Sequence, residues 1–477
     1  MTTQVVALCI LILLLAAIGG LLCCRHIAKT HGGYANIKVL IIVNYVLVQA
    51  VSGIVHLTGI GTGFRGYYDL LTGPPNTALI VTASCALGMV ALCLACVQGA
   101  APRTQAVPRA HHHPPDIHNR WLSTGEIWII CIAIALIALP ALNAISILSS
   151  YVGRTGATRV ISLDGGMARY SFIANWLVWV ISLGALLIAG RRAALRPMMT
   201  LAVVGIAVVL IAASLSWTGG RSIVVLMVLP LVLTLLPRLK RVQWFALPLA
   251  IISLLAYVAV ISQVRSDSLV RGAGVNLANW LDWEWGRFSL GGFAVDYVNK
   301  HGLLYGETFW RGITSAVMGP LNLLGFSGTN TALRSSMELS GQELAGSREL
   351  VYVVPGLSAE LYLNFGLLGV TIGYYVLGRV CGLVDTQFTK ARGTLARLAF
   401  SFIGAVLVLR TIPSDSGSLY IFVFYTGFPL LACAFIARQL RQKPKGAPYN
   451  PASVARQSLA RRRAVLKRPE IAGDPVD

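Results

Sequence analysis

Runs of about 20 consecutive apolar residues recur along most of the chain and limit what it can fold into. A helix of that length spans the ~30 Å hydrocarbon core of a bilayer. Only 12% of the residues are charged and 56% are hydrophobic, whereas soluble domains carry roughly 25% charged residues. The first run, Val5 to Cys24, lacks a preceding basic segment and a small-residue cleavage site, so we expect a retained helix. The sequence predicts an all-α, polytopic membrane protein.

Eleven membrane spans are predicted from these runs. They cover residues 4–24, 37–59, 77–99, 126–149, 170–190, 198–217, 222–237, 245–263, 355–378, 394–411 and 418–437. The first eight spans occupy residues 1–263 and the last three occupy residues 355–437. One long loop, residues 264–354, lies between these two groups, and a basic tail, residues 438–477, follows the last span.

The orientation follows from lysine and arginine, which are retained on the cytoplasmic side during insertion. An outside N-terminus places 26 of the 39 basic residues in cytoplasmic connections and in the tail. We therefore expect a cytoplasmic C-terminus and an outer long loop. A basic tail on a membrane protein is best explained by contact with anionic lipid headgroups. Membrane lipids are expected partners, and nucleic acid is not.

The long outer loop is the most informative region, because loops of about ninety residues are usually functional. A set of apolar residues spaced by three and four predicts an amphipathic helix lying in the membrane surface. These residues are Phe309, Trp310, Ile313, Val317, Leu321 and Leu324. Trp280, Trp283 and Trp285 form an earlier cluster that suits the headgroup zone.

Charged residues near the outer ends of spans are the candidate site, because burying a charge in a membrane is costly. Arg221 lies in a Gly-Gly-Arg-Ser turn, Arg410 ends the tenth span before Asp415, and Glu360 lies one turn into the ninth span. The planar guanidinium group suits phosphate. Such residues together could bind a diphosphate and hold one general base, with Glu360 the first candidate and Asp415 the second.

The same surface offers further candidates for substrate binding. They are Arg287, Arg311, Arg348 and Tyr362. Each charged candidate also has a structural interpretation, since an outer arginine can anchor a helix and Glu360 can pair with an arginine. No cluster of His, Cys and carboxylate residues at metal-ligand spacing is visible on the outer side, so we expect neither a metal nor a cofactor.

Several short segments resemble the bacterial Wzy-type O-antigen and repeat-unit polymerases. They are the turn at residues 219–222, the long loop after the eighth span, and the Ser-Ala-Glu-Leu-Tyr-Leu-Asn-Phe-Gly-Leu-Leu-Gly segment at residues 358–369. Arg410 before Asp415 and Ser416, and Arg287-Phe288-Ser289 early in the loop, resemble the branch of this family that polymerises enterobacterial common antigen. The resemblance covers roughly residues 200–430.

The resemblance implies a metal-independent glycosyl transfer at the outer leaflet of the bacterial inner membrane. A growing glycan on undecaprenyl diphosphate is the donor, and one repeat unit on undecaprenyl diphosphate is the acceptor. The arginines would stabilise the leaving diphosphate. The implied partners are this lipid-linked oligosaccharide and a chain-length regulator.

Three other functions remain open. A lipid-linked oligosaccharide flippase or transporter would also span the membrane repeatedly, although we see no internal repeat and essentially no acid in the middles of the spans. A polyprenyl-phosphate-dependent glycosyltransferase would place acids in the first outer loop, where this chain has Asp69. An O-antigen ligase would carry a histidine-rich outer site, whereas His301 is the only histidine in residues 264–354.

Overall fold

The computed structural model describes residues 1–31, 36–60, 68–98, 229–230, 286–323, 333–346, 353–391 and 394–427, with single residues up to 439. Every regular element within these ranges is a helix. Four helical segments are long and apolar enough to cross a membrane: Thr3–Thr30, Ile37–Leu57, Pro75–Gln98 and Gly356–Lys390. The predicted class, an all-helical membrane protein, is confirmed for this part of the chain. The five spans predicted between residues 126 and 263 lie outside the described residues, apart from residues 229–230.

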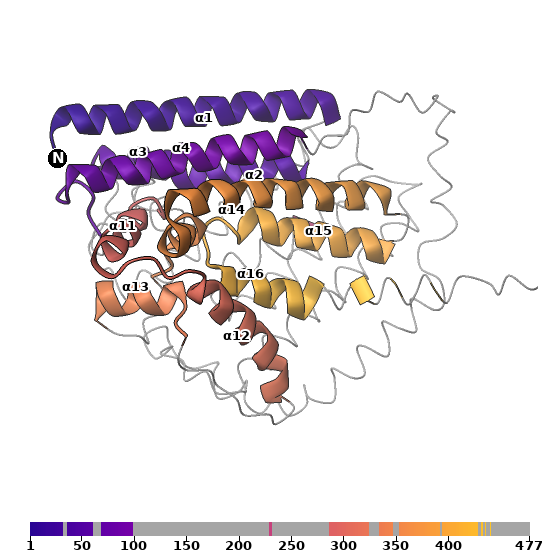
Figure 1. Cartoon of the computed structure of the whole chain (residues 1–477). Helices are drawn as coiled ribbons and strands as arrows, with labels where there is room; N and C mark the ends of the chain where they lie inside the picture. Colours follow the sequence, from indigo (N-terminus) through magenta and orange to yellow (C-terminus); the bar gives the residue numbers. More distant parts are fainter. Residues whose placement is uncertain are drawn as a thin grey trace, which may run out of the picture.

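The N-terminal helices form the first layer of the bundle (Figure 1). α1 covers Thr3–His31 and α4 covers Pro75–Gln98. Between them, α2 (Ile37–Tyr45), the π-helical segment η1 (Val46–Val51) and α3 (Ser52–Leu57) form one continuous helical run. α1 leaves an apolar stripe exposed, formed by Leu8, Leu11, Leu15, Ile18 and Leu22. Since a stripe of this kind is costly in water, we expect it to face lipid.

The C-terminal helices form the second layer. α14 covers Gly356–Lys390, α15 covers Thr394–Leu409, and α16 (Ser416–Phe422) leads into the π-helical η5 (Val423–Gly427). α14 continues beyond residue 378, where the predicted ninth span ends. A Cβ at Gly378 would lie 2.7 Å from Ala95 Cβ, and the Tyr375 hydroxyl donates to Gln98 Oε1 at 2.6 Å, so the end of α4 lies beside the second half of α14. The last part of α14 projects past the end of α4.

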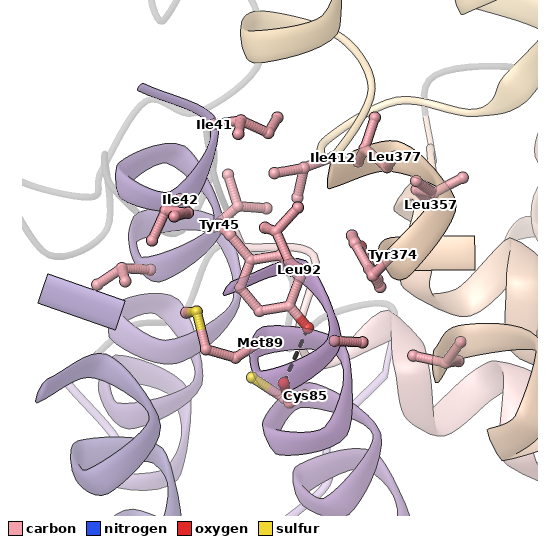
Figure 2. Close-up of a cluster of buried hydrophobic side chains, with 14 of the residues drawn as sticks. Ile41, Ile42, Tyr45, Cys85, Met89, Leu92, Leu357, Tyr374, Leu377 and Ile412 are labelled. Carbon is pink, nitrogen blue, oxygen red and sulfur yellow. Dashed lines mark hydrogen bonds between the residues drawn. The ribbon is translucent and has the colours of Figure 1, made fainter. Parts of the chain in front are cut away.

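The two layers meet around a pair of buried tyrosines (Figure 2). The Tyr45 and Tyr374 rings pack edge to face with centroids 4.7 Å apart, a favoured aromatic geometry. The Tyr45 hydroxyl donates to the Cys85 carbonyl at 2.9 Å, which satisfies its polar atom inside the core. Both rings fit because Gly88 on α4 carries no side chain: a Cβ there would collide with the Tyr45 hydroxyl and come within 2.9 Å of the Tyr374 ring.

We therefore expect Gly88→Ala to destabilise the bundle despite the higher helix propensity of alanine. Overpacking of a tight core typically costs about 1–3 kcal/mol, and thermal unfolding in detergent would measure the loss. Gly19→Ala is the matched control, because a Cβ at Gly19 would meet nothing within 4 Å. An unchanged melting temperature for Gly88→Ala would mean that the two tyrosines do not pack as described.

The long predicted loop contributes three helices to the described structure. They are α11 (Leu290–His301), α12 (Glu307–Leu323) and α13 (Ser336–Ala345). The amphipathic helix predicted from residues 309–324 corresponds to α12, which keeps Trp310 and Val317 exposed. Its other face packs on α16, where a Cβ on Gly312 would lie 3.0 Å from the Gly417 backbone. Small residues allow this close approach of two helices.

The described connections gather at the two ends of the bundle. The Met1 amine donates to the Leu71 carbonyl at 2.9 Å, and α11, α13, the start of α14 and residues 410–416 lie at this same end, which we call the Met1 end (Figure 1). Acids and bases are mixed there: Asp69, Asp296, Glu307, Glu338, Glu343, Glu360 and Asp415 accompany Arg287, Lys300, Arg311, Arg334 and Arg410. The charged residues toward the opposite end are nearly all basic: Arg25, Lys29, Lys38, Arg379, Lys390 and Arg397, with Asp385.

Candidate functional site

α14 breaks near its start, and the break organises the Met1 end. Gly366 has φ +65° and ψ −156°, a conformation open to glycine, so residues 356–365 form a short half-helix before the longer one. A break of this kind frees backbone carbonyls. The Leu363 carbonyl accepts from the Leu304 N–H at 3.0 Å, and the Asn364 carbonyl accepts from the Tyr305 N–H at 3.1 Å. The connection between α11 and α12 is thereby docked onto the broken helix.

Asn364 completes this docking with its side chain. Its Oδ1 accepts from the Gly306 N–H at 2.9 Å, and its Nδ2 donates to the Thr308 hydroxyl at 2.8 Å. Nδ2 also donates to the Glu360 carbonyl at 2.7 Å. A buried amide with three satisfied contacts fixes the start of α12 relative to the half-helix.

Glu360 lies at the centre of the site. Its side chain is 1% exposed. Oε1 accepts from the Thr308 hydroxyl and from the Ser416 hydroxyl, both at 2.8 Å, and Oε2 accepts from the Ser416 N–H at 2.7 Å. A single carboxylate thus joins α12, α14 and the first residue of α16. A negative charge is favourable at that helix N-terminus, which helps explain how a buried acid is tolerated.

Asp415 contributes a second carboxylate to the same helix start. Its side chain is 2% exposed, and Oδ1 accepts from the Ser418 N–H at 3.0 Å as the N-cap of α16. Burial raises the pKa of the Asp415 carboxyl above its ordinary value, while the hydrogen bonds from Ser418 lower it. Glu338 on α13 acts in the same direction as burial. Asp415 is therefore a positioned group with a weakened acidity.

Arg410 begins the turn that precedes Asp415, and Arg287 contacts the same turn. Arg287 Nε donates to the Pro413 carbonyl at 3.0 Å. Its side chain passes close to Gly356, whose φ is +81° and where a Cβ would come within 3.2 Å of Arg287 Cβ. The Arg410 guanidinium lies 5.1 Å from the centroid of the Phe422 ring, a cation–π distance. Both arginines are half-buried, so each is oriented by the protein rather than free to swing.

The other predicted site residues are distributed around this centre. Arg311 Nη2 lies 3.4 Å from Glu338 Oε1, the acid that completes a capping box at the start of α13. Tyr362 lines a small cavity together with Arg287. Arg221 and Arg348 lie outside the described residues. The structure thus brings Glu360, Asp415, Arg287 and Arg410 to one end of the bundle, with Arg311 and Tyr362 at its margin.

Sequence reasoning missed the residues that hold Glu360 in place. Thr308, Asn364 and Ser416 are uncharged and belong to three different elements, so their meeting depends on tertiary structure. Two signals were present in the sequence. Thr308 is a polar residue on the buried side of an amphipathic helix, and Asn364 stands two residues before the glycine that breaks α14.

Asp69, which favoured a polyprenyl-phosphate-dependent enzyme, takes part in local structure. Its Oδ1 accepts from the Leu71 N–H at 2.9 Å and lies 3.6 Å from His56 Nε2. A second acid nearby, Asp296, accepts hydrogen bonds from the Tyr68 and Thr77 hydroxyls. Burial and Asp296 raise the pKa of Tyr68. These contacts tie Tyr68 and the start of α4 to α11.

The described ranges contain no group of three or more His, Cys, Asp or Glu residues arranged to hold a metal ion. The groups described around Glu360 are carboxylates, hydroxyls and guanidinium groups. Comparison with known proteins adds no family: no protein-family model, no curated protein and no solved structure matches this chain.

Proposed function

We propose that this protein is a polysaccharide polymerase of the bacterial inner membrane. It would transfer a growing glycan from undecaprenyl diphosphate to a repeat unit that is itself carried on undecaprenyl diphosphate. The proposal rests on the resemblance of short segments to Wzy-type polymerases and on one structural observation. That observation is the convergence of Arg287, Arg410, Glu360 and Asp415 around the broken start of α14.

The arginines suit the leaving group. When the bond between the anomeric carbon and the diphosphate oxygen breaks, negative charge grows on the diphosphate. Guanidinium groups held in place before the reaction stabilise this charge without having to reorganise. Arg287 is held by Pro413 and Arg410 by Phe422, so both meet the requirement for preorganisation. Arg221 would be a third member of the set.

Glu360 suits the acceptor hydroxyl. Oε1 already accepts from two hydroxyl groups, those of Thr308 and Ser416. A sugar hydroxyl that replaced one of them would present the same donor to the same oxygen. As that hydroxyl oxygen bonds to the anomeric carbon, its proton passes to the carboxylate and the lipid diphosphate leaves. Asp415, at the same helix start, is the second candidate base.

The charge distribution of the described helices supports the proposed orientation. The opposite end of the bundle is strongly basic, as cytoplasmic ends are, whereas the Met1 end carries both signs. We therefore expect the Met1 end to face outward.

Cysteine accessibility tests this orientation in a background without native cysteines. Asn299→Cys at the Met1 end should react with a membrane-impermeant maleimide in intact cells with a permeabilised outer membrane. Thr389→Cys, near the end of α14, should react only after the inner membrane is opened. Both positions are exposed. Reaction of both from the same side would refute the arrangement.

Reconstitution tests the activity. Purified protein in liposomes with a lipid-linked repeat unit should produce a ladder of longer lipid-linked glycans. Absence of extension by folded protein, across repeat units of the producing organism, would refute the proposal.

A flippase for lipid-linked oligosaccharides is the second candidate, and the break in α14 favours it. Transporters often build their sites at discontinuous helices with a buried acid, and Glu360 lies on the short half of such a helix. The same liposomes distinguish the two functions. If the lipid-linked repeat unit moves between leaflets and no glycan is extended, the flippase function is supported and the polymerase function is refuted.

A further inference from the structure

A small cavity lies behind the candidate site, between η1, α4, α11 and the start of α14. Its walls include Gln49, Ser84, Arg287, Ser358 and Tyr362. It has room for about one group the size of a water molecule. Among its wall residues in the described part of the chain, none is acidic and the one charged residue is Arg287. The cavity is therefore suited to a hydrogen-bond acceptor that carries negative charge.

Gln49 is the feature that requires explanation. Its side chain is 2% exposed, and no group in the described residues hydrogen-bonds to Nε2. An unsatisfied buried donor costs about 1–3 kcal/mol, so such groups usually have a purpose. Gln49 belongs to the π-helical segment η1, and π-helical turns inside α-helices frequently mark functional positions. Gln49 lines the cavity, and within the described ranges its amide nitrogen is left without a hydrogen-bond partner.

The start of α14 forms another wall of the cavity. Ser358 and Ala359 belong to its first turn, and the N–H groups of a helix N-terminus favour anions. The Leu357 N–H is already bound by the Ile412 carbonyl at 3.1 Å, which fixes this turn against the one that contains Pro413. Three independent features, the helix start, the Arg287 charge and the Gln49 amide, thus favour a negatively charged oxygen in one place.

We infer that this cavity is a subsite for one anionic oxygen of a phosphate group, bound by Gln49 Nε2 with the rest of the phosphate at Arg287. The inference rests on the proposed function if the phosphate belongs to a lipid-linked substrate. A free phosphate-class anion would use the same contacts. In either case Gln49 is a binding residue on a helix that the polymerase resemblance does not include.

Binding measurements on the full chain in lipid nanodiscs test the inference. The probes are undecaprenyl diphosphate, undecaprenol as its phosphate-free counterpart, and inorganic pyrophosphate. Gln49→Leu removes the amide at similar volume and should weaken diphosphate binding on the order of tenfold, the lower range for a hydrogen bond to a charged group. Gln49→Glu keeps the shape of the side chain but adds a negative charge, so it should weaken diphosphate binding further. Binding of undecaprenol should not change in either variant.

Thr82→Val is the matched control. Thr82 is 0% exposed and its hydroxyl also lacks a partner among the described residues, but it does not line the cavity. Its removal should leave diphosphate binding unchanged. Dependence of pyrophosphate binding on Gln49 would identify a free anion as a ligand, and dependence of the lipid diphosphate alone would identify the lipid.

Two results would overturn the inference. In the first, the wild type binds undecaprenyl diphosphate no better than undecaprenol and does not bind pyrophosphate; in the second, folded Gln49→Leu and Gln49→Glu bind both the lipid diphosphate and pyrophosphate as the wild type does. The second result would mean that the cavity holds an ordinary buried water. The polymerisation assay separates the two proposals. If diphosphate binding depends on Gln49 but no glycan is extended, the polymerase proposal is refuted and the subsite proposal stands. If both Gln49 variants extend glycans at the wild-type rate, the polymerase proposal stands and the subsite proposal is refuted.

Discussion

Glu360→Gln should reduce glycan extension by roughly 10²- to 10⁴-fold, the contribution typical of a positioned general base. The amide cannot accept the proton of the sugar hydroxyl. It can, however, be accommodated in the existing network. With its oxygen toward the Ser416 N–H, its NH₂ group can donate to the Thr308 and Ser416 hydroxyls, which rotate to accept. The fold should therefore survive, with a loss of stability of about 1–3 kcal/mol.

The measurement is the rate of ladder formation per folded protein, together with the melting temperature. Glu343→Gln is the matched control, because Glu343 is an exposed acid on α13 at the same end of the bundle. It should extend glycans at the wild-type rate. If folded Glu360→Gln also extends at that rate while its melting temperature falls, Glu360 only positions α12 and α16, and Asp415 becomes the remaining candidate for the base.

Thr308→Val separates positioning from proton transfer. It removes one of the two hydroxyl donors to Glu360 Oε1 and one acceptor of Asn364 Nδ2. If Glu360 is the base, the acid limb of the pH–rate profile should move to higher pH in Thr308→Val, because the carboxylate loses a hydrogen bond that favours its charged form. A carboxylate that acts only by holding α12 would show a similar loss of stability in Thr308→Val and in Glu360→Gln, with no shift in the pH profile of either variant.

The sequence predicts features that depend on neighbouring residues better than features that depend on tertiary contacts. Span positions follow from local hydropathy, and residues 37–59 and 77–99 correspond closely to the helical run from Ile37 to Leu57 and to α4. The amphipathic period of the loop likewise located α12. The break at Gly366 was not predicted, because glycine is common in membrane helices and the apolar run continues across it. Nothing local distinguishes a glycine that breaks a helix from one that packs in it, such as Gly88.

The candidate site shows the same difference between local signals, which the sequence carries, and long-range contacts, which it does not. Charge near the end of a span is a local signal: it drew attention to Glu360, Arg410 and Asp415, and the long loop added Arg287. The structure places these four residues at the Met1 end. Their partners are set by tertiary packing. The sequence suggested an arginine as the structural partner of Glu360, whereas the described contacts to its carboxylate come from Thr308 and Ser416. Gln49 gave no signal at all, since one amide in an apolar span is ordinary until its cavity is seen.

Arg410→Lys should lower the rate of extension on the order of 10²-fold, the scale seen when one preorganised donor is lost. Lysine keeps the charge but loses the planar, two-pronged donor and much of the stacking on Phe422. Because these contacts strengthen as the diphosphate leaves, the loss should fall on turnover more than on the apparent affinity for the lipid-linked substrate. Arg221→Lys should behave in the same way if Arg221 belongs to the set.

Two further variants show whether orientation of the guanidinium, rather than charge, carries the effect. Phe422→Leu leaves Arg410 intact but removes the ring 5.1 Å from it, so it should cause a smaller loss of the same kind, in turnover and not in affinity. Arg379→Lys is the matched control, since Arg379 is an exposed arginine on the long half of α14, away from the Met1 end. It should extend glycans normally. Wild-type turnover in folded Arg410→Lys would show that Arg410 only anchors the start of α16. Of the two described arginines proposed to bind the leaving diphosphate, only Arg287 would then remain.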